Sequence, residues 1–590
     1  MANAVLSRPR VISNQGRHAF DRSQVRNFNT HAGFITPIFM EPCIAGTKGK
    51  INRRVFTRSA SVVAPNFTSV QQHFDFIKIP IRLVFSAWND WKLNINDINS
   101  SALIKSVSGS PDLALPISVP CCDFGNGLVS RVTTNWRTHV PTVLEMTMAK
   151  HLNYMGRLLS SLGYGSNDQL FNSAGSSVAN ILSLIPLACY QKAYYDIYRN
   201  STYESNNPFA YNLDWLYNAN SQILDFTNVD QFIHFLDLTT ARFVNYRNDY
   251  FHNIYPSLNY SQSSPNGSTW DIPSNVSGTR STYTTNQFRN ININGSSSLI
   301  QLGSNFSSNQ VITAQSVRTM FALDKLLRAS AYASKHVRDQ FKARFGVDVG
   351  DKVSHECQRL GSFVHDIVFG EVTSTSDVPS GSSLGEVGAK GVGGHDFNDK
   401  DIEFYCEEDS IILGVTYFMP RAMYDVALDE YNMKLYREDF FQDEFQNLGL
   451  RPIYVKNVYP DMAPSILNNI VGYTVPNQRY KLGRDINTGL FCGYLYDFDV
   501  NSGSVRSSRK TGTLQSFTTS NIASRFASPY STGGGVNATY FKVQPEDLDS
   551  LFGLSFDSLY ASQLTDQFYG QVRIKFAVTQ GMSVHGQPSL

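Results

Sequence analysis

Apolar and polar residues alternate along several short segments of the chain, which is typical of strands with one face in a core and one face in water. The alternation is clearest over residues 572–579, where valine, isoleucine and phenylalanine take turns with Arg573 and Lys575. This segment therefore predicts a strand of an antiparallel sheet that has one wet face.

Three further segments have the composition of strands. Residues 364–373 and 411–419 are rich in β-branched and aromatic side chains, which fit a pleated, half-buried surface. Residues 73–85 share this composition but include Pro80, which cannot donate a hydrogen bond to a neighbouring strand. We expect this last segment at a sheet edge or at a bend.

Two segments show the three- and four-residue spacing of helices. Residues 313–345 place apolar side chains at these steps and basic ones on the other face, and Gly346 follows, so they predict an amphipathic helix. Residues 186–198 predict a second helix with a tyrosine stripe, which packs either in the core or against another subunit. The stripe provides three candidate subunit contacts: Tyr190, Tyr194 and Tyr198.

The order of these elements favours one fold class. Helices do not alternate with strands as a parallel sheet requires, and the strand candidates lie far apart in the sequence, so they must pair non-locally. We expect a mainly β protein, an antiparallel barrel or sandwich whose connections have grown into helices and long loops.

One long polar segment carries almost no charge. Residues 252–312 are rich in Ser, Asn, Thr and Gly but contain only one acid and two bases. Disordered linkers usually hold themselves open with charge, so this composition favours an ordered surface excursion. Its aromatic side chains add three candidate subunit contacts: Trp270, Tyr283 and Phe288.

At 590 residues the chain exceeds the usual size of one domain, so two domains or one domain with large insertions both fit its length. We divide it into a basic amino-terminal arm (1–60), a first part of the β fold with helical insertions (61–251), the polar surface insertion (252–312), and the remainder of the β fold with the carboxyl-terminal strands (313–590).

Charge is distributed unevenly, although the net charge is only +1. Residues 1–60 hold ten bases and two acids, and residues 500–541 hold four bases and no acid. Such segments either are solvated tails or neutralise phosphates without reading bases. The candidate DNA contacts are Arg8, Arg10, Arg17, Arg22 and Arg26 in the arm, and Arg506, Arg509 and Lys510 in the second segment.

Motifs for catalysis are missing from the sequence, which has no GxSxG, no HExxH and no paired Cys/His signature. The glycine-rich residues 385–394 are not followed by a helix that could receive a phosphate, so we expect a flexible loop there. The acids within 399–409 do not have the spacing of a calcium loop, and a solvated turn between strands is favoured over an ion site. We expect no enzyme, no cofactor and no metal site.

The cysteines and the apolar stretches of the sequence indicate the compartment in which the chain folds. Seven cysteines without CxxC spacing favour free thiols in a reducing cytoplasm. The first twenty residues lack the apolar core of a signal peptide, and no stretch of about eighteen apolar residues occurs, so we expect neither host-signal secretion nor membrane insertion.

Seven segments occur in the order in which one family arranges its sequence blocks. They are THAGFITPIFMEPCIAGTKGKI (30–51), RLVFSAWNDW (82–91), PLACYQKAYYDIYRN (186–200), RNDYF (247–251), FKARFGV (341–347), DEFQNLGL (443–450) and VGYTVPNQRYK (471–481). Together they resemble the major capsid proteins of the microviruses (Microviridae), small tailless single-stranded DNA phages, and especially the gokushovirus-like branch.

This resemblance implies a single eight-stranded antiparallel jelly-roll barrel with long helical and loop insertions. It also implies self-assembly into a T=1 icosahedral shell around a single-stranded DNA genome, with the basic arm inside and residues 252–312 projecting near the threefold axes, where they could serve host attachment. The implied partners are other copies of the chain, the genome, a minor capsid or DNA pilot protein and a host-surface receptor. The implied location is the virion, after assembly in the host bacterial cytoplasm.

A carbohydrate-binding or carbohydrate-cleaving jelly-roll protein is the alternative, because aromatic-rich polar loops are common in such proteins. A glycosidase needs two carboxylates that face each other across a cleft, and residues 399–409 hold the dense acid cluster of this sequence. An adhesin that binds through the polar excursion is a third hypothesis. Particle formation by the expressed chain discriminates among the three.

Overall fold

The structure is a computed structural model, and its description covers only part of the chain. The described residues are 16–62, 69–93, 118–124, 128–139, 148–165, 181–216, 223–255, 269–273, 280–284, 336–350, 355–373, 387–397, 399–423, 429–443, 450–458, 470–486, 541–543 and 566–582, together with single positions at 318, 322, 325, 333, 334, 488, 489, 548, 552 and 584.

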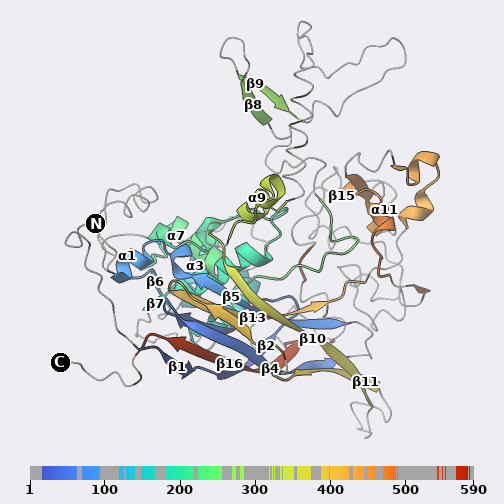
Figure 1. The fold of residues 1–590 in the computed structure, drawn as a ribbon. Coiled ribbons are helices and arrows are strands. Elements are labelled where there is room, and N and C mark those ends of the chain that lie inside the picture. The colour runs from blue at the N-terminus through green and yellow to red at the C-terminus, as the bar shows by residue number, and fades with distance from the viewer. Residues whose placement is uncertain are drawn as a thin grey trace, which may run out of the picture.

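One antiparallel sheet of ten strands organises the molecule (Figure 1). Its strands are β1 (His18–Asp21), β2 (Gln24–Thr30), β3 (Thr36–Cys43), β4 (Lys48–Val62), β5 (Val70–Pro80), β10 (Gln358–Thr373), β11 (Val387–His395), β12 (Ile402–Tyr405), β13 (Ser410–Pro420) and β16 (Phe568–Gln580). Hydrogen bonding runs in the order β1-β16-β4-β11-β10-β5-β13-β3, with β12 beside β4 and β2 beside β16.

The sheet curls until its two ends face each other across a core. The ring of Phe418 on β13 stacks on that of Phe568 on β16 with centroids 4.0 Å apart. Phe39 on β3 meets Phe576 on β16 edge-on at 5.0 Å. β16 is near one end of the strand order and β3 is the other end, so these contacts close the curl. The expected mainly β, antiparallel class is confirmed.

The strand predictions hold, and of the two positions expected for residues 73–85, a bend and not a sheet edge is confirmed, because a 3₁₀ turn (Ile81–Leu83) follows Pro80 directly. Residues 572–579 lie in β16, whose side chains alternate between buried and exposed as their pattern indicates. Residues 364–373 and 411–419 lie in β10 and β13. β5 is not an edge strand, because it pairs with both β10 and β13, and Pro80 is tolerated since it is the last residue of the strand.

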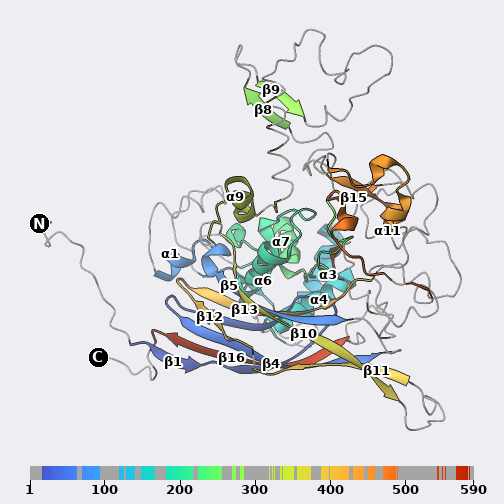
Figure 2. The same cartoon turned by 45° about the vertical axis from the view of Figure 1, so that its right-hand side comes forward.

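Helices cover the outer side of the half of the sheet that contains β5 and β13 (Figure 2). They are α1 (Trp88–Leu93), α3 (Leu128–His139), α4 (Met148–Ser161), α6 (Ile185–Ala193) and α7 (Val229–Thr239). Farther from the sheet lie α9 (Val337–Phe345), none of whose residues is buried, and α11 (Val455–Val458). Short strand pairs accompany them: β6 (Cys121–Asp123) with β7 (Ile181–Ser183), β8 (Thr269–Pro273) with β9 (Arg280–Thr284), and β14 (Arg451–Tyr454) with β15 (Ile470–Thr474).

The helix predicted over residues 313–345 is confirmed in part: Arg318, Ala322 and Lys325 are helical, but the helix is interrupted before α9. A bend at Ala333 and the non-helical backbone of His336 precede α9, so the helix that Gly346 ends begins only at Val337. Gly346 has φ = 69°, a left-handed conformation that suits glycine and ends the helix. Most of the earlier residues lie outside the described part of the chain.

The basic arm also requires a new boundary. Residues 18–62 form β1 to β4 and pair along β16, β11, β12 and β13, so they are part of the sheet and not an arm that fails to fold alone. Apolar side chains at alternate positions of β4, such as Ile51 and Val55, are buried and explain why this segment folds. Any arm therefore ends before His18.

The expectation of a flexible loop over 385–394 is wrong for residues 387–394, which lie in β11 and pair with β10 and β4. Its glycines fit because large side chains of β10 lie against them. A Cβ atom on Gly393 would stand 2.3 Å from Cδ1 of Ile367, and one on Gly391 would stand 2.8 Å from Cε1 of Phe369. Glycine here allows close packing within a strand.

Candidate subunit and nucleic-acid surfaces

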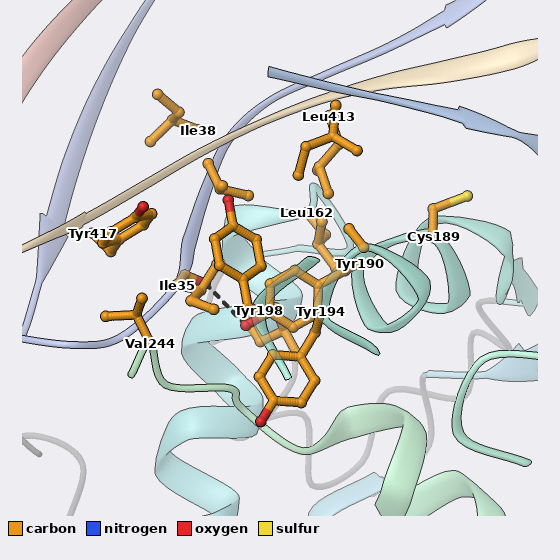
Figure 3. Packing of buried hydrophobic residues seen from close by; sticks show 14 of the residues in the cluster. Ile35, Ile38, Leu162, Cys189, Tyr190, Tyr194, Tyr198, Val244, Leu413 and Tyr417 are labelled. Atoms are coloured by element: carbon orange, nitrogen blue, oxygen red, sulfur yellow. Dashed lines mark hydrogen bonds between the residues drawn. The ribbon is translucent and has the colours of Figure 1, made fainter. Parts of the chain in front are cut away.

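The predicted tyrosine stripe lies in the core of the chain itself (Figure 3). α6 continues into a single π-helical turn over Tyr194–Tyr198, which confirms the predicted helix. Tyr190 and Tyr194 are each 1% exposed, and Tyr198 is 8% exposed. The core interpretation of the stripe therefore fits the structure, and these three side chains offer almost no surface to another subunit.

Each hydroxyl of the stripe donates a hydrogen bond within the chain. Tyr190 donates to the carbonyl of Ile35 at 2.9 Å, and Tyr194 donates to Glu204 at 2.6 Å. Tyr198 donates to the carboxylate of Asp75 at 2.6 Å. Burial raises the pKa of all three phenols, so they stay protonated donors.

Asp75 joins the helical layer to the sheet. Its side chain on β5 is fully buried and accepts hydrogen bonds from Tyr198, from Tyr417 of β13 at 3.1 Å and from Arg359 of β10 at 2.6 Å. The buried carboxylate is thus satisfied by two phenols and one guanidinium, as a charge in a core requires.

An exposed group of aromatic and aliphatic side chains surrounds two short 3₁₀ turns, Glu430–Met433 and Arg437–Asp439, which are orange in Figure 1. We call this group the aromatic patch, and its members are Tyr431, Leu435, Tyr436, Phe440, Phe441, Tyr480 and Leu482. Leu435 is 77% exposed and Tyr436 is 71% exposed. Clustered apolar side chains left in water mark an interaction surface.

The aromatic patch is held together by ring contacts. Tyr431 and Phe440 meet edge-on with centroids 6.1 Å apart, and Phe441 lies 6.3 Å from Tyr480. The ammonium of Lys434 stands 4.8 Å from the centroid of the Tyr480 ring. These side chains therefore form a preformed surface, which costs less ordering on association than separate side chains would.

α9 presents a second apolar face to solvent. Val337, Phe341 and Phe345 recur at four-residue steps and are 50%, 42% and 70% exposed. The rings of the two phenylalanines touch with centroids 5.7 Å apart. The helical spacing found in the sequence is correct here, but its apolar side faces water in the single chain.

The outward side of β4 and β16 is strongly basic. We call it the basic sheet face, and it consists of Lys48, Lys50, Arg54, Phe56 and Arg58 on β4 with Tyr569, Arg573 and Lys575 on β16, all exposed. The register of the two strands places Arg54 directly opposite Arg573, and Arg58 directly opposite Tyr569. None of the helices in the described part of the chain covers this layer in Figures 1 and 2.

The predicted DNA contacts are only partly within the described residues. Arg17 is exposed. Arg22 pairs with Glu41 and donates to the carbonyl of Pro42 at 2.9 Å, and Arg26 donates to the carbonyl of Ser161 at 2.9 Å. These last two guanidinium groups therefore already have partners within the chain. The other candidates lie outside the described residues: Arg8, Arg10, Arg506, Arg509 and Lys510.

Of residues 252–312 the structure describes 252–255 and the hairpin of β8 and β9. His252 and Ile254 are buried, so the predicted surface excursion begins only after them. The register of the hairpin pairs Trp270 with Tyr283, so these two candidate contact residues are cross-strand neighbours. Figure 1 draws the hairpin beyond α9, away from the large sheet. Phe288 lies outside the described residues.

The acid cluster of residues 399–409 flanks β12. Asp399 accepts from the Arg53 guanidinium at 3.1 Å, and Asp401 accepts from Asn52 at 2.6 Å. Asp409 pairs with Lys92 and accepts from the indole of Trp88 at 3.2 Å. In the part of the chain that the structure describes, no three metal-ligating side chains come together.

A cavity of about 300 Å³ lies between the first 3₁₀ turn of the aromatic patch and β14. Its acids have structural partners: Glu430 accepts from Tyr250 at 2.8 Å, and Asp439 accepts from the backbone amides of Leu435 and Tyr436. A glycosidase would need two carboxylates free to act on a sugar, which these contacts do not favour.

His365 makes the fold sensitive to acid. Its ring faces the core of the curled sheet and stacks on Phe74 with centroids 5.8 Å apart. Burial, with the nearby Arg53, lowers the pKa of His365 to about 4 from an ordinary value of 6.5. The unfolded chain therefore binds a proton near pH 6.5, whereas the folded chain does so only near pH 4.

Stability is expected to fall as the pH drops from about 6.5 toward 4, by about 2 kcal/mol at pH 5 from this one histidine. His365→Phe keeps the ring contact and removes the group that binds the proton. The free energy of unfolding of the variant, measured in urea, should therefore fall less between about pH 7 and pH 5 than that of the wild type. His18→Phe, at an exposed position of β1, is the matched control. Equal losses in wild type and His365→Phe would contradict this assignment.

Sequence reasoning missed the basic sheet face, although a signal for it exists. Within residues 48–58 the even positions carry Lys48, Lys50, Arg54 and Arg58, whereas Ile51 and Val55 stand at odd positions, so a weaker period of two is present, which Arg53 and Phe56 interrupt. Counting all ten bases of residues 1–60 as one flexible arm concealed this period of two. The aromatic patch has no periodic signal, because it lies on short turns.

Comparison with known proteins identifies the family of the chain. A family model described as capsid protein (F protein) matches residues 10–117 and 190–590, which is most of the chain. The intervening residues 118–189 hold α3 and α4. No curated protein matches the sequence. None of the helices in the described part of the chain has the length and apolar character to cross a bilayer. The chain belongs to the capsid protein (F protein) family, the major capsid family of the microviruses.

Proposed function

We propose that the chain assembles into a T=1 icosahedral shell that encloses a single-stranded DNA phage genome. We also propose that the eight strands on the main path of its curled sheet form a jelly roll, with β2 and β12 beside it. The observation that carries this proposal is the match to the capsid family over residues 10–117 and 190–590. The curled antiparallel sheet supports it, because two facing sheet halves around one core are the framework of a jelly roll.

Subunit contacts would use the two apolar surfaces that the single chain leaves in water. The aromatic patch and the exposed side of α9 have the composition of interface cores, in which aromatic side chains are enriched. Another copy of the chain is the occupant we assign to both, since a shell is built from repeated contacts of one subunit. Closed symmetry repeats each contact in every subunit, so modest interfaces suffice.

The remaining surfaces would serve the genome and the host. The segment before β1, with Arg8, Arg10 and Arg17, and the segment with Arg506, Arg509 and Lys510 would face inward and neutralise phosphates. The surface excursion after Ile254, with Trp270, Tyr283 and Phe288, would form the threefold protrusion and meet the host-surface receptor. A minor capsid or DNA pilot protein would complete the virion, after assembly in the host bacterial cytoplasm.

Particle formation tests this function. The full chain, expressed in a bacterial host, is expected to give uniform closed particles in negative-stain electron microscopy and a void-volume peak in size exclusion. The particles should dissociate under conditions that leave the fold intact, because each contact is weak alone. A chain that stays monomeric at all concentrations, alone and with the accessory proteins of its phage, would refute the proposal.

A further inference from the structure

The basic sheet face brings like charges together and neutralises them only in part. Arg54 and Arg573 are directly opposite each other on β4 and β16, an arrangement that destabilises a sheet unless an anion lies over it. Lys575 follows two residues after Arg573 on the same side of β16. The repulsion among these positive charges is tolerated on the outer face of the sheet only where solvent or a bound partner screens it.

Acids neutralise only the margin of this face. Lys50 pairs with Glu403 at 2.8 Å, and Arg54 lies 3.6 Å from Asp396. Among the described residues, Arg58, Arg573 and Lys575 have no carboxylate in ion-pair contact. Asp21 on β1 attracts Arg573 and Lys575 only at longer range. The centre of the face therefore keeps an excess of positive charge.

Two exposed rings lie among these bases. Phe56 on β4 is 47% exposed and Tyr569 on β16 is 41% exposed, although each belongs to a strand whose other face is buried in the core. The guanidinium of Arg58 lies 5.0 Å from the centroid of the Phe56 ring, and Tyr569 is the cross-strand neighbour of Arg58. Exposed rings flanked by cations form a platform on which bases can stack while phosphates meet the charges.

We propose that the basic sheet face binds single-stranded DNA without reading its sequence, with bases stacked on Phe56 and Tyr569 and phosphates at Arg54, Arg58, Arg573 and Lys575. This inference rests on the proposed function, because it assigns a part of the inner shell surface to the genome. The rings select the single strand, since the bases of a duplex are stacked on each other and cannot reach them.

Charge and stacking make separate contributions that one titration series can distinguish. The purified full chain is titrated into fluorescent oligothymidylate at several salt concentrations, and anisotropy gives the affinity and its salt slope. The double variant Arg54→Ser, Arg573→Ser should bind about tenfold more weakly and lower the slope by roughly 1.4, about 0.7 for each phosphate that is no longer neutralised. The double variant Phe56→Ala, Tyr569→Ala should also bind about tenfold more weakly, with the slope unchanged.

The matched control removes the same charge elsewhere. Lys342 on α9 and Arg421 after β13 are exposed and lie outside the basic sheet face, so Lys342→Ser, Arg421→Ser should keep the affinity within about twofold. Equal weakening by this control would reduce the effect to net charge and overturn the inference. So would equally tight binding of duplex DNA, or variants that bind oligothymidylate normally and change only the sedimentation of the chain, which would make the face a contact between copies.

The DNA content of assembled particles distinguishes failure of the DNA site from failure of the shell function on which it rests. Variant particles that form normally and retain the wild-type amount of DNA per subunit would overturn the DNA site while leaving the shell function in place. Failure of the wild-type chain to form particles, alone and with the accessory proteins of its phage, would refute the shell function, while the oligothymidylate titration still decides whether the face binds single strands.

Discussion

Replacement of Leu435 and Tyr436 by serine is expected to prevent particle formation and to leave the subunit folded. These two side chains are the most exposed members of the aromatic patch, so their loss removes little from the core of the single chain. In an assembled shell the same side chains would be buried against another copy, and their removal would subtract directly from the contact energy.

The expected loss of contact free energy follows from the apolar area that these side chains would bury. Full burial of one leucine contributes about 2 kcal/mol, which corresponds to about a thirtyfold change in the association constant of each contact. Every subunit repeats the contact, so the concentration at which particles appear should rise at least by that factor. At the concentration where the wild type is fully assembled, the variant should remain as free subunits.

Size exclusion and electron microscopy measure the effect, and thermal unfolding of the free subunit checks the fold. Leu93→Ser is the matched control, because Leu93 is 64% exposed at the end of α1 and lies outside the aromatic patch. The control should assemble like the wild type. Particles of the patch variant at wild-type yield and concentration would exclude the patch from subunit contacts.

Local composition and periodicity predict β5, β10, β13, β16 and the fold class, but not β1 to β4 or β11. β16 was readable because each of its apolar side chains at one parity meets the core and each polar one meets water, which is the physical origin of the pattern. β13 was readable for the opposite reason: it is buried almost throughout and consists of β-branched, aromatic and aliphatic residues.

Local periodicity does not show which strands pair over long sequence distances. Arg53 illustrates the difficulty, because its charge suggested a solvated arm while its side chain is fully buried, with its guanidinium 4.6 Å from the ring of Phe363 and 3.1 Å from Asp399. These partners lie some three hundred residues further along the chain. The sign of a charge in the sequence does not indicate whether a later strand will cover it.

Helical spacing identified the tyrosine face of α6 but not what covers it. Core and subunit contact require the same apolar stripe, and only the position of the sheet distinguishes them. Tyr190 and Tyr198 proved to be bonded to Ile35 and Asp75 of the same chain. α9 shows the reverse case, since Phe341 and Phe345 occupy an equally clear stripe that the single chain leaves exposed.

Substitution of Asp75 by alanine is expected to cost about 3 kcal/mol of folding stability, because it removes one partner of a buried ion pair. Three donors, on Tyr198, Tyr417 and Arg359, would lose their common acceptor. The two phenols are buried and cannot recover water as a partner, so the unmet hydrogen bonds add to the loss of the ion pair.

Urea unfolding of the free subunit measures the change as a shift in midpoint at constant slope. Asp366→Ala is the matched control, because Asp366 is exposed on β10 and accepts only a surface hydrogen bond from Gln71 at 3.0 Å, so its loss should cost no more than about 0.5 kcal/mol. Tyr417→Phe removes one of the three donors and should cost about 1 kcal/mol. The costs of Asp75→Ala and Tyr417→Phe should be non-additive in the double variant, since both remove the same hydrogen bond. If Asp75→Ala costs no more than Asp366→Ala, the buried carboxylate does not join the helical layer to the sheet, and the packing of α6 on β5 and β13 must rest on apolar contact alone.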